Sequence, residues 1–322
     1  MLMKYLDYDK FSDFYRREFQ HEIASGQTAV GIDQQHDSGY YDIVRFFGDG
    51  SINPDRVAIE YLPGCFELSD PKIAAFAQKV AKMLSDQGRL YDGPSVTKLV
   101  GCNFCTDRPR IRIQQASYRD FAGSCFALDL SDPLFHNDGG TLRNYYNRIC
   151  QSRDIAENPL ALSLGVCGVI VIAETDRTFL VVVRRASRLA SLEGTISPAA
   201  AGSVDFVEGY QSLGELIDAS LGAEIAEELA FANDDYEMTP LAYAREVFRG
   251  ENPQLFCMIR TSLNRRELDE HLKSIDPTHS ELTEHLYIEL DSNNRLSGKA
   301  LGDLNHEAAM NCFLVEEYLS VI

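Results

Sequence analysis

Hydrophobic and polar positions in the second half of the chain repeat with the periods of strands and helices. Two β-rich runs, Leu164–Ala173 and Phe179–Val183, are separated by the polar residues Glu174–Arg177, so they predict a β-hairpin. A loop is predicted next, over Ser197–Gly202, because this segment contains a proline, a glycine and otherwise small residues. The elements predicted further on are helices over residues 213–231, 265–275 and 307–319 and strands over residues 241–248, 255–261 and 286–290.

The first hundred residues also alternate between helical and strand-like segments. Residues 73–84 predict an amphipathic helix, because apolar side chains recur on one stripe of it. Strands are predicted over residues 42–47 and 57–62, and a turn over Tyr91–Pro94. Since strands and helices alternate through the chain without a regular βαβ period, we expect an α/β fold with a mixed sheet between helices.

Length and composition favour a globular protein of one large domain or two ordinary ones. The chain has 322 residues, of which 45% are hydrophobic and 25% charged. We expect an α+β N-terminal region at residues 1–155 and a second domain at residues 156–322. The net charge of −19 argues against duplex nucleic acid or an anionic membrane as a partner, because both bind basic surfaces.

The same composition bears on the cellular compartment. Eight cysteines without regular spacing favour reduced thiols over a disulfide framework. Residues 1–10 have no apolar segment typical of a secretory signal, and the longest apolar run, Leu162–Ala173, is too short to cross a membrane. We therefore expect a cytoplasmic protein.

A single acidic helix carries the candidate chemistry. Between Leu189 and Ala244 the sequence has 56 residues with 11 acids and no Lys, Arg or His. Glu224, Glu227 and Glu228 stand at positions i, i+3 and i+4, so a helix places them on one face, where their like charges repel. Crowded carboxylates suit Mg²⁺ or Mn²⁺. A solvated acidic face is the competing explanation, and acidic runs are commonly that.

The segment around these glutamates resembles the Nudix box, GX5EX7REUXEEXGU, in which U is a bulky apolar residue. Ala223 stands where the box has arginine, and Ala230 where it has its second glycine. That glycine ends the box helix, a role for which Asn233 is a candidate substitute. The positions that match the box are Gly209, Glu215, Glu224, Ile225, Glu227, Glu228 and Phe231.

The resemblance leaves the first box glycine open. Gly209 has the right spacing from Glu215, whereas Ser197-Pro198 leading to Gly202 better fits the strand and turn that precede the box. In either case the resemblance implies a Nudix α/β/α sandwich. It also implies a metal site of Glu224, Glu227 and Glu228, to which we add Gly202, and catalysis by the same three glutamates.

Four short segments outside the box resemble the vertebrate Nudix branch that hydrolyses UDP-glucose and UDP-galactose, a branch that also lacks the box arginine. This resemblance implies attack of water on a phosphorus of the diphosphate bridge, with UMP and a sugar 1-phosphate as products. It leaves open which glutamate or loop carboxylate is the base. The matching segments are Leu90–Pro94, Ser117–Phe121, Arg184–Ser187 and Ala244–Glu246.

These segments contribute four candidate substrate contacts. Arg184 and Arg185 end a strand, so their side chains point to opposite faces and at most one reaches a phosphate in a single site. Arg245 is the first positively charged residue after the acidic stretch, and the ring of Tyr118 is able to stack on uracil. For each of them a surface position, a structural ion pair or core packing is the competing explanation.

Three functions are therefore open. The first is a metal-dependent pyrophosphatase acting on a UDP-sugar or a similar small nucleotide. The second is a Nudix-fold module that binds nucleotide without turnover. The third is a folded domain whose acidic helix is only a surface.

Overall fold

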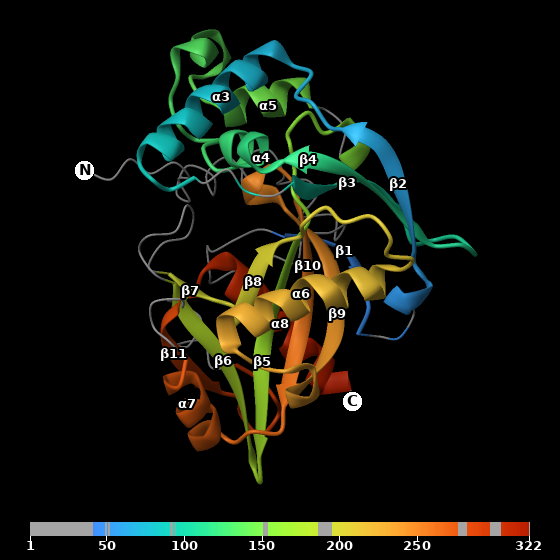
Figure 1. The fold of residues 1–322 in the computed structure, drawn as a ribbon, viewed down its shortest axis with the longest axis vertical. Coiled ribbons are helices and arrows are strands. Elements are labelled where there is room, and N and C mark those ends of the chain that lie inside the picture. Colours follow the sequence, from blue (N-terminus) through green and yellow to red (C-terminus); the bar gives the residue numbers. More distant parts are fainter. Residues whose placement is uncertain are drawn as a thin grey trace.

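The protein contains two β-sheets with helices on their faces, seen in the lower and upper halves of Figure 1. The computed structural model describes residues 41–321 apart from 49, 51, 91, 92, 94, 151–153, 186–194, 276–281 and 297–303. The turn predicted at Tyr91–Pro94 lies outside these residues except for Gly93.

The larger sheet is mixed, as expected. Its strands follow the order β1-β9-β10-β5-β6-β11, with β7 beside β6 and β8 beside β5. β10 runs parallel to β5, and the other neighbours are antiparallel. The strands are β1 (Tyr41–Phe46), β5 (Gly165–Glu174), β6 (Arg177–Arg185), β7 (Ile196–Ser197), β8 (Ala200–Ser203), β9 (Tyr236–Glu246), β10 (Asn252–Thr261) and β11 (Leu282–Glu289).

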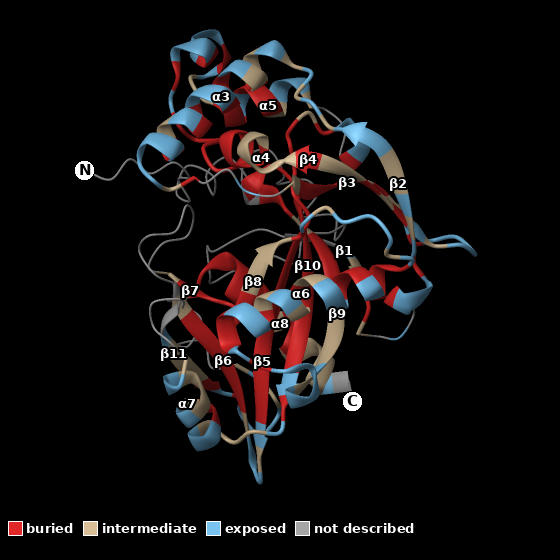
Figure 2. Ribbon diagram, in the orientation of Figure 1, coloured by how far each residue is buried: buried red, intermediate tan, exposed pale blue. Residues whose placement is uncertain are grey.

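Helices cover both faces of this sheet, which gives the expected α/β/α sandwich. α6 (Leu213–Leu229) and α7 (Arg265–Lys273) bury their apolar residues in a cluster on one face. α8 (His306–Val321) packs into a second cluster on the other face. Figure 2 shows β5, β6 and β10, which lie between these helices, as buried along most of their length. Within the described ranges, no helix is both long and apolar enough to cross a membrane.

The smaller sheet has the order β2-β4-β3 and packs beneath three helices (Figure 1). The helix predicted over residues 73–84 is confirmed as α3. It begins earlier than expected because Asp70 caps it and Pro71 suits its first turn. No element was predicted from the sequence at the positions of β3, β4, α4 and α5. The elements are β2 (Ala58–Cys65), α3 (Pro71–Asp86), β3 (Ser95–Asn103), β4 (Arg110–Ser117), α4 (Tyr118–Cys125) and α5 (Leu142–Ile149), with 3-10 turns η1 (Pro54–Arg56), η2 (Pro133–Asp138), η3 (Ile155–Glu157), η4 (Asn233–Asp235) and η5 (Val247–Arg249).

One prediction for the larger sheet is wrong. Ser197–Gly202 was expected to be a loop, but β7 ends at Ser197 and β8 begins at Ala200. Backbone pairing with β6 and β5 makes these strands, and small residues leave no alternating pattern that reveals them. The strand expected at residues 241–248 is also longer at its start and shorter at its end, because β9 runs from Tyr236 to Glu246.

The smaller sheet holds the segment that leads from β8 into α6. Thr97 N donates to Val204 O at 2.8 Å, and Phe206 N donates to Ser95 O at 2.9 Å. On the other side of this segment, Leu213 N donates to Val57 O at 2.9 Å. β1 pairs with β9, so residues 41–46 belong to the larger sheet. The boundary at residues 155–156 stays a prediction, and the start of α6 depends on contacts across it.

Candidate functional site

The first turn of α6 is fixed by a reciprocal cap. Glu215 N donates to Ser212 Oγ at 3.2 Å, while Gln211 N donates to Glu215 Oε2 at 2.7 Å. These bonds satisfy backbone donors that a helix start leaves unpaired. Glu215 therefore has a structural role in beginning the helix, at the opposite end from the three glutamates.

Two of the three glutamates lie against β8. Ala201 N donates to Glu228 Oε2 at 3.3 Å, and the Glu228 side chain is buried. A Cβ atom on Gly202 would lie 1.8 Å from Glu224 Oε1, so the Glu224 carboxylate occupies the space that a side chain would need. Glu227 is exposed. A side chain at position 202 would therefore displace the Glu224 carboxylate from this place, and the strand backbone contacts both Glu224 and Glu228.

The two candidate box glycines differ in surroundings. Gly202 touches Glu224, as described above, whereas a Cβ on Gly209 would meet no atom within 4 Å. Gly209 N donates to Tyr61 Oη at 3.1 Å, so this glycine faces the smaller sheet. By position in the fold, Gly202 is the glycine beside the glutamates.

The end of α6 also differs from expectation. Ala230 takes the left-handed conformation with φ of 53° and ends the helix. Asn233, the suggested substitute for the missing glycine, instead begins η4. His271 of α7 lies against the same end, with Nε2 at 2.8 Å from Leu229 O. The helix therefore ends at Leu229, one residue after Glu228, and Ala230 closes it in a conformation that usually favours glycine.

Acidic groups crowd the rest of α6. Burial raises the pKa of Asp218, and the charge of Asp55 raises it further. A Cβ on Gly214 would lie 1.9 Å from Asp55 Oδ1, so η1 packs closely on the helix. Such a concentration of carboxylates produces a negative local potential that attracts cations.

The candidate arginines take part in other contacts. Arg184 Nε donates to Glu284 Oε2 of β11 at 3.0 Å in an exposed cross-strand pair. Val182 belongs to the α8-side cluster and Val183 to the α6-side cluster, so alternation places Arg184 on the α8 face. Arg185 ends β6, and its side chain lies outside the described residues.

The other two candidates lie elsewhere. Arg245 is largely buried and forms an ion pair with Glu251 at 3.5 Å. Tyr118 begins α4, where its ring centroid lies 5.9 Å from that of Phe121. The structure thus brings Gly202, Glu224 and Glu228 together and gives Arg184, Arg245 and Tyr118 structural contacts of their own.

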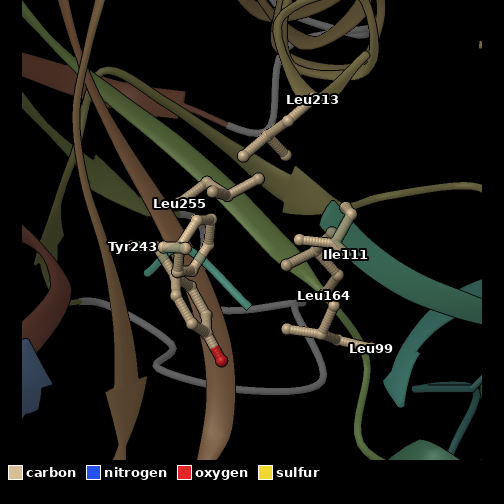
Figure 3. Close-up of a pocket in the computed structure, with 7 residues that line it drawn as sticks. Leu99, Ile111, Leu164, Leu213, Tyr243 and Leu255 are labelled. Carbon is tan, nitrogen blue, oxygen red and sulfur yellow. The ribbon is translucent and has the colours of Figure 1, made fainter. Parts of the chain in front are cut away.

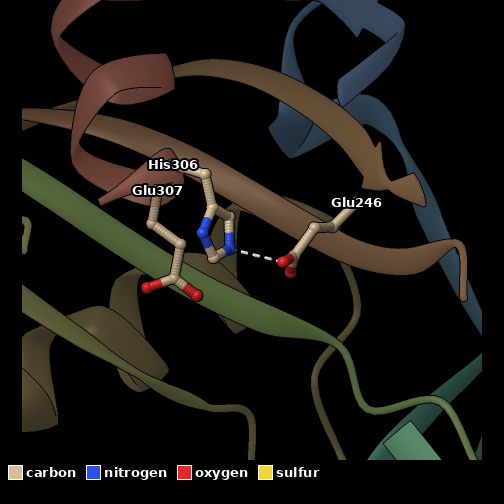
Figure 4. A group of neighbouring side chains, drawn as sticks. All are labelled: Glu246, His306 and Glu307. Atoms are coloured by element: carbon tan, nitrogen blue, oxygen red, sulfur yellow. Dashed lines mark ion pairs between the residues drawn. The ribbon is translucent and has the colours of Figure 1, made fainter. Parts of the chain in front are cut away.

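Sequence reasoning missed a buried ionic network on the opposite face of the sheet. Figure 4 shows Glu246 of β9 beside His306 and Glu307 of α8. His306 Nε2 pairs with Glu246, and Arg249 pairs with both carboxylates, at 2.5 Å to Glu246. Although burial alone would raise it, the pKa of Glu246 is lowered by Arg249 and His306. The i, i+3 spacing of Glu246 and Arg249 was the one signal of this network in the sequence.

Three metal-ligating side chains meet in this network, but its charges are already balanced by arginine. Within the described part of the chain, Glu246, His306 and Glu307 form the group whose ligand atoms lie within 4.8 Å of one another. Arg249 contacts both of its carboxylates, so a cation there would have to displace a buried guanidinium. We interpret the group as a structural network.

An apolar cavity lies where the smaller sheet packs on the larger one (Figure 3). Its volume is about 10 Å³, room for at most a single water molecule. It is therefore too small to be a nucleotide site. The lining residues are Leu99, Phe104, Ile111, Leu164, Leu213, Tyr243 and Leu255.

No protein-family model and no curated protein matches the sequence. Among solved structures, the Nudix domain of Shewanella oneidensis NrtR complexed with ADP-ribose is 14% identical, with 49% of this chain and 89% of that chain covered and a TM-score of 0.33. The Ap4A hydrolase of C. elegans is 12% identical over 50% of this chain and 97% of that chain, with a TM-score of 0.29. A MutT/Nudix family protein of Listeria innocua is 13% identical over 49% of this chain and 93% of that chain, with a TM-score of 0.32. At these values the similarities assign neither a family nor an activity to the chain.

Proposed function

We propose that the chain is a Nudix-type pyrophosphatase that hydrolyses the diphosphate bond of a substituted nucleoside diphosphate, with a UDP-sugar as the first candidate. One observation carries this proposal. Glu224 and Glu228 lie against the backbone of β8 at Gly202, on a helix within a 56-residue stretch that has no basic side chain. The box resemblance predicts the same residues as metal ligands.

The donors present fit Mg²⁺ or Mn²⁺. Carboxylate and backbone carbonyl oxygens are the ligands that such hard cations prefer. The absence of a side chain at Gly202 leaves β8 close to Glu224, and the Ala201 N–H orients Glu228. A bound Mg²⁺ supplies neutralisation of the diphosphate and polarisation of the phosphorus that is attacked.

The glutamates then have separate roles. We assign ion binding to Glu224 and Glu228, which β8 holds in place. Glu227 is exposed on the same helix, and we assign to it acceptance of the proton from the attacking water. The water oxygen bonds to phosphorus, the bridging P–O bond breaks, and the products are UMP and a sugar 1-phosphate. Arg184, Arg185, Arg245 and Tyr118 remain proposed substrate contacts, and Arg184 and Arg245 would have to exchange their glutamate partners for phosphate.

The proposed setting is the cytoplasm, and all eight cysteines are free thiols in the structure. This agrees with a reducing compartment.

The test is turnover of UDP-glucose with Mg²⁺, followed by the appearance of UMP and glucose 1-phosphate, in wild type and Glu228→Gln. We expect kcat/KM to fall by more than about 10³-fold in the variant, because a charged group at the reacting centre is lost. Glu289→Gln, which removes an exposed glutamate of β11 that pairs with Arg177, is the matched control and should keep activity.

Two other outcomes correspond to the other functions. If UDP-glucose or UDP raises the unfolding temperature but no product forms, the chain is a nucleotide-binding module. If Mg²⁺ and UDP change neither turnover nor unfolding, α6 is an acidic surface and the proposal is wrong.

A further inference from the structure

β8, which a two-residue connection joins to β7, carries the backbone that contacts the glutamates of α6. Ala201 N–H binds Glu228, and Gly202 lies against Glu224. Upstream of them, β7 is only two residues long and pairs with β6 through Val183 and Arg184. So short a strand depends on the contacts at its other edge for its position.

The two residues directly before α8, Leu304 and Asn305, contact that other edge. Asn305 N donates to Ile196 O at 2.7 Å, and Asn305 Nδ2 donates to Ser197 Oγ at 2.7 Å. Leu304 pairs with Ile196 in a parallel bridge. Asn305 and Ser197 are 6% and 1% exposed, so water does not replace these bonds readily.

Asn305 is itself fixed. Its Oδ1 accepts from Ala308 N at 2.8 Å, which caps the start of α8. The next two residues, His306 and Glu307, are held by Glu246 and Arg249 in the buried ionic network. Because the first turn of α8 is anchored on this side, we expect β7 to follow α8 in position.

We propose that Asn305 is a positioning residue for the metal centre and acts through Ser197 from the face of the sheet opposite α6. This inference rests on the proposed function. Pro198 and the buried Ala199 join Ser197 to β8, and proline restricts the backbone at that point. A displacement of Ser197 therefore moves Ala201 and Gly202 relative to the glutamates.

The bond between Asn305 and Ser197 can be removed from either end without deleting the helix cap. Ser197→Ala leaves Asn305 intact, and Asn305→Ser keeps an oxygen for capping α8 but is too short to reach Ser197. Ser124→Ala is the matched control: Ser124 is fully buried, and its Oγ donates to Asp120 O at 2.7 Å in the smaller-sheet region.

The measurement is the rise in unfolding temperature as Mg²⁺, and separately Mn²⁺, is added, from which an apparent Kd follows. We expect Ser197→Ala and Asn305→Ser each to weaken binding about fivefold, because groups that orient metal ligands affect affinity on this scale or above. The double variant should be no weaker than Asn305→Ser, since that substitution already removes the bond to Ser197, together with a longer bond from Asn305 Nδ2 to Thr195 Oγ1 at 3.4 Å. Ser124→Ala should bind as wild type does.

Two results would overturn the inference while leaving the proposed function intact. One is wild-type affinity for both ions in Ser197→Ala and Asn305→Ser, and the other is an equal loss in Ser124→Ala. If the wild-type chain itself responds to neither ion, the metal centre of the proposed function fails, and this inference fails with it.

Discussion

Two groups of glutamates lie on opposite faces of the same end of the larger sheet, and their charges have different surroundings. On the α8 face, Glu246 and Glu307 are paired with Arg249 and His306. On the α6 face, Glu228 accepts a backbone N–H of β8 and Glu224 lies against Gly202. The register from β9 through β10 and β5 to β8 brings the two groups to this one end.

On the proposed function, the difference separates charges that stabilise the fold from charges that bind the metal ion. Arg249 of η5 and His306 of α8 offset the negative charge of Glu246 inside the protein, so the pKa of Glu246 is lowered despite its complete burial. The stretch that contains α6 has no base of its own to offer Glu224 and Glu228. Repulsion among carboxylates weakens that helix, and a divalent cation would reverse the effect. Substitutions on the α8 face should therefore change stability, and those on the α6 face activity.

The largest effect on stability is expected from Arg249→Met. The variant leaves Glu246 and Glu307 buried without their guanidinium partner, so the free energy of unfolding should fall by about 4 kcal/mol. Urea denaturation measures it. Arg177→Met is the control, because its pair with Glu289 is half-exposed and is worth less than about 1 kcal/mol. A free energy of unfolding for Arg249→Met within about 1 kcal/mol of wild type would contradict the claim that the charges on the α8 face stabilise the fold.

Local spacing accounts for what the sequence could reveal of these groups. The i, i+3, i+4 pattern of Glu224, Glu227 and Glu228 predicted a helix whose end lies two residues from the observed one at Leu229. Exposure of Glu227 and burial of Glu228 depend on where β8 lies, and β8 has no hydrophobic period to predict it. The bond from Asn305 to Ser197 spans 108 residues, so only the folded chain shows it.

Lys98 extends the comparison of the two glutamate groups to a buried positive charge, because its hydrogen-bond acceptor is a backbone carbonyl and not a carboxylate. Its Nζ donates to Leu160 O at 2.8 Å and lies 4.2 Å from the centroid of the Phe66 ring. Burial lowers the pKa of Lys98 from 10.5 to about 8. Between these values the unfolded chain binds the proton more tightly than the folded chain. The contribution of Lys98 to stability therefore improves by about 3 kcal/mol as the pH rises from 8 to 10.5.

The variant Lys98→Met isolates this contribution from the other groups that titrate at high pH. It should be more stable than wild type at pH 7, and the difference should shrink between pH 8 and 10.5. Urea denaturation at a series of pH values measures the difference. Thr261→Val removes a buried hydroxyl that does not titrate in this range, so its difference from wild type should stay constant between pH 8 and 10.5. A pH-independent difference for Lys98→Met would mean that the folded protein holds this charge without cost.

The smallest effect is expected at the end of α6, where Ala230→Gly should stabilise the protein by about 1 kcal/mol. Ala230 has a φ of 53°, a conformation that glycine adopts without the contact between Cβ and backbone that alanine suffers. Ala226→Gly, an exposed position within the same helix, should instead destabilise by about 1 kcal/mol, because glycine there adds freedom to the unfolded chain. Both are measured by urea denaturation without metal. Opposite signs would show that the helix ends under strain one residue after Leu229. Equal losses would mean that α6 continues through Ala230 in solution and presents the Glu228 carboxylate differently to β8.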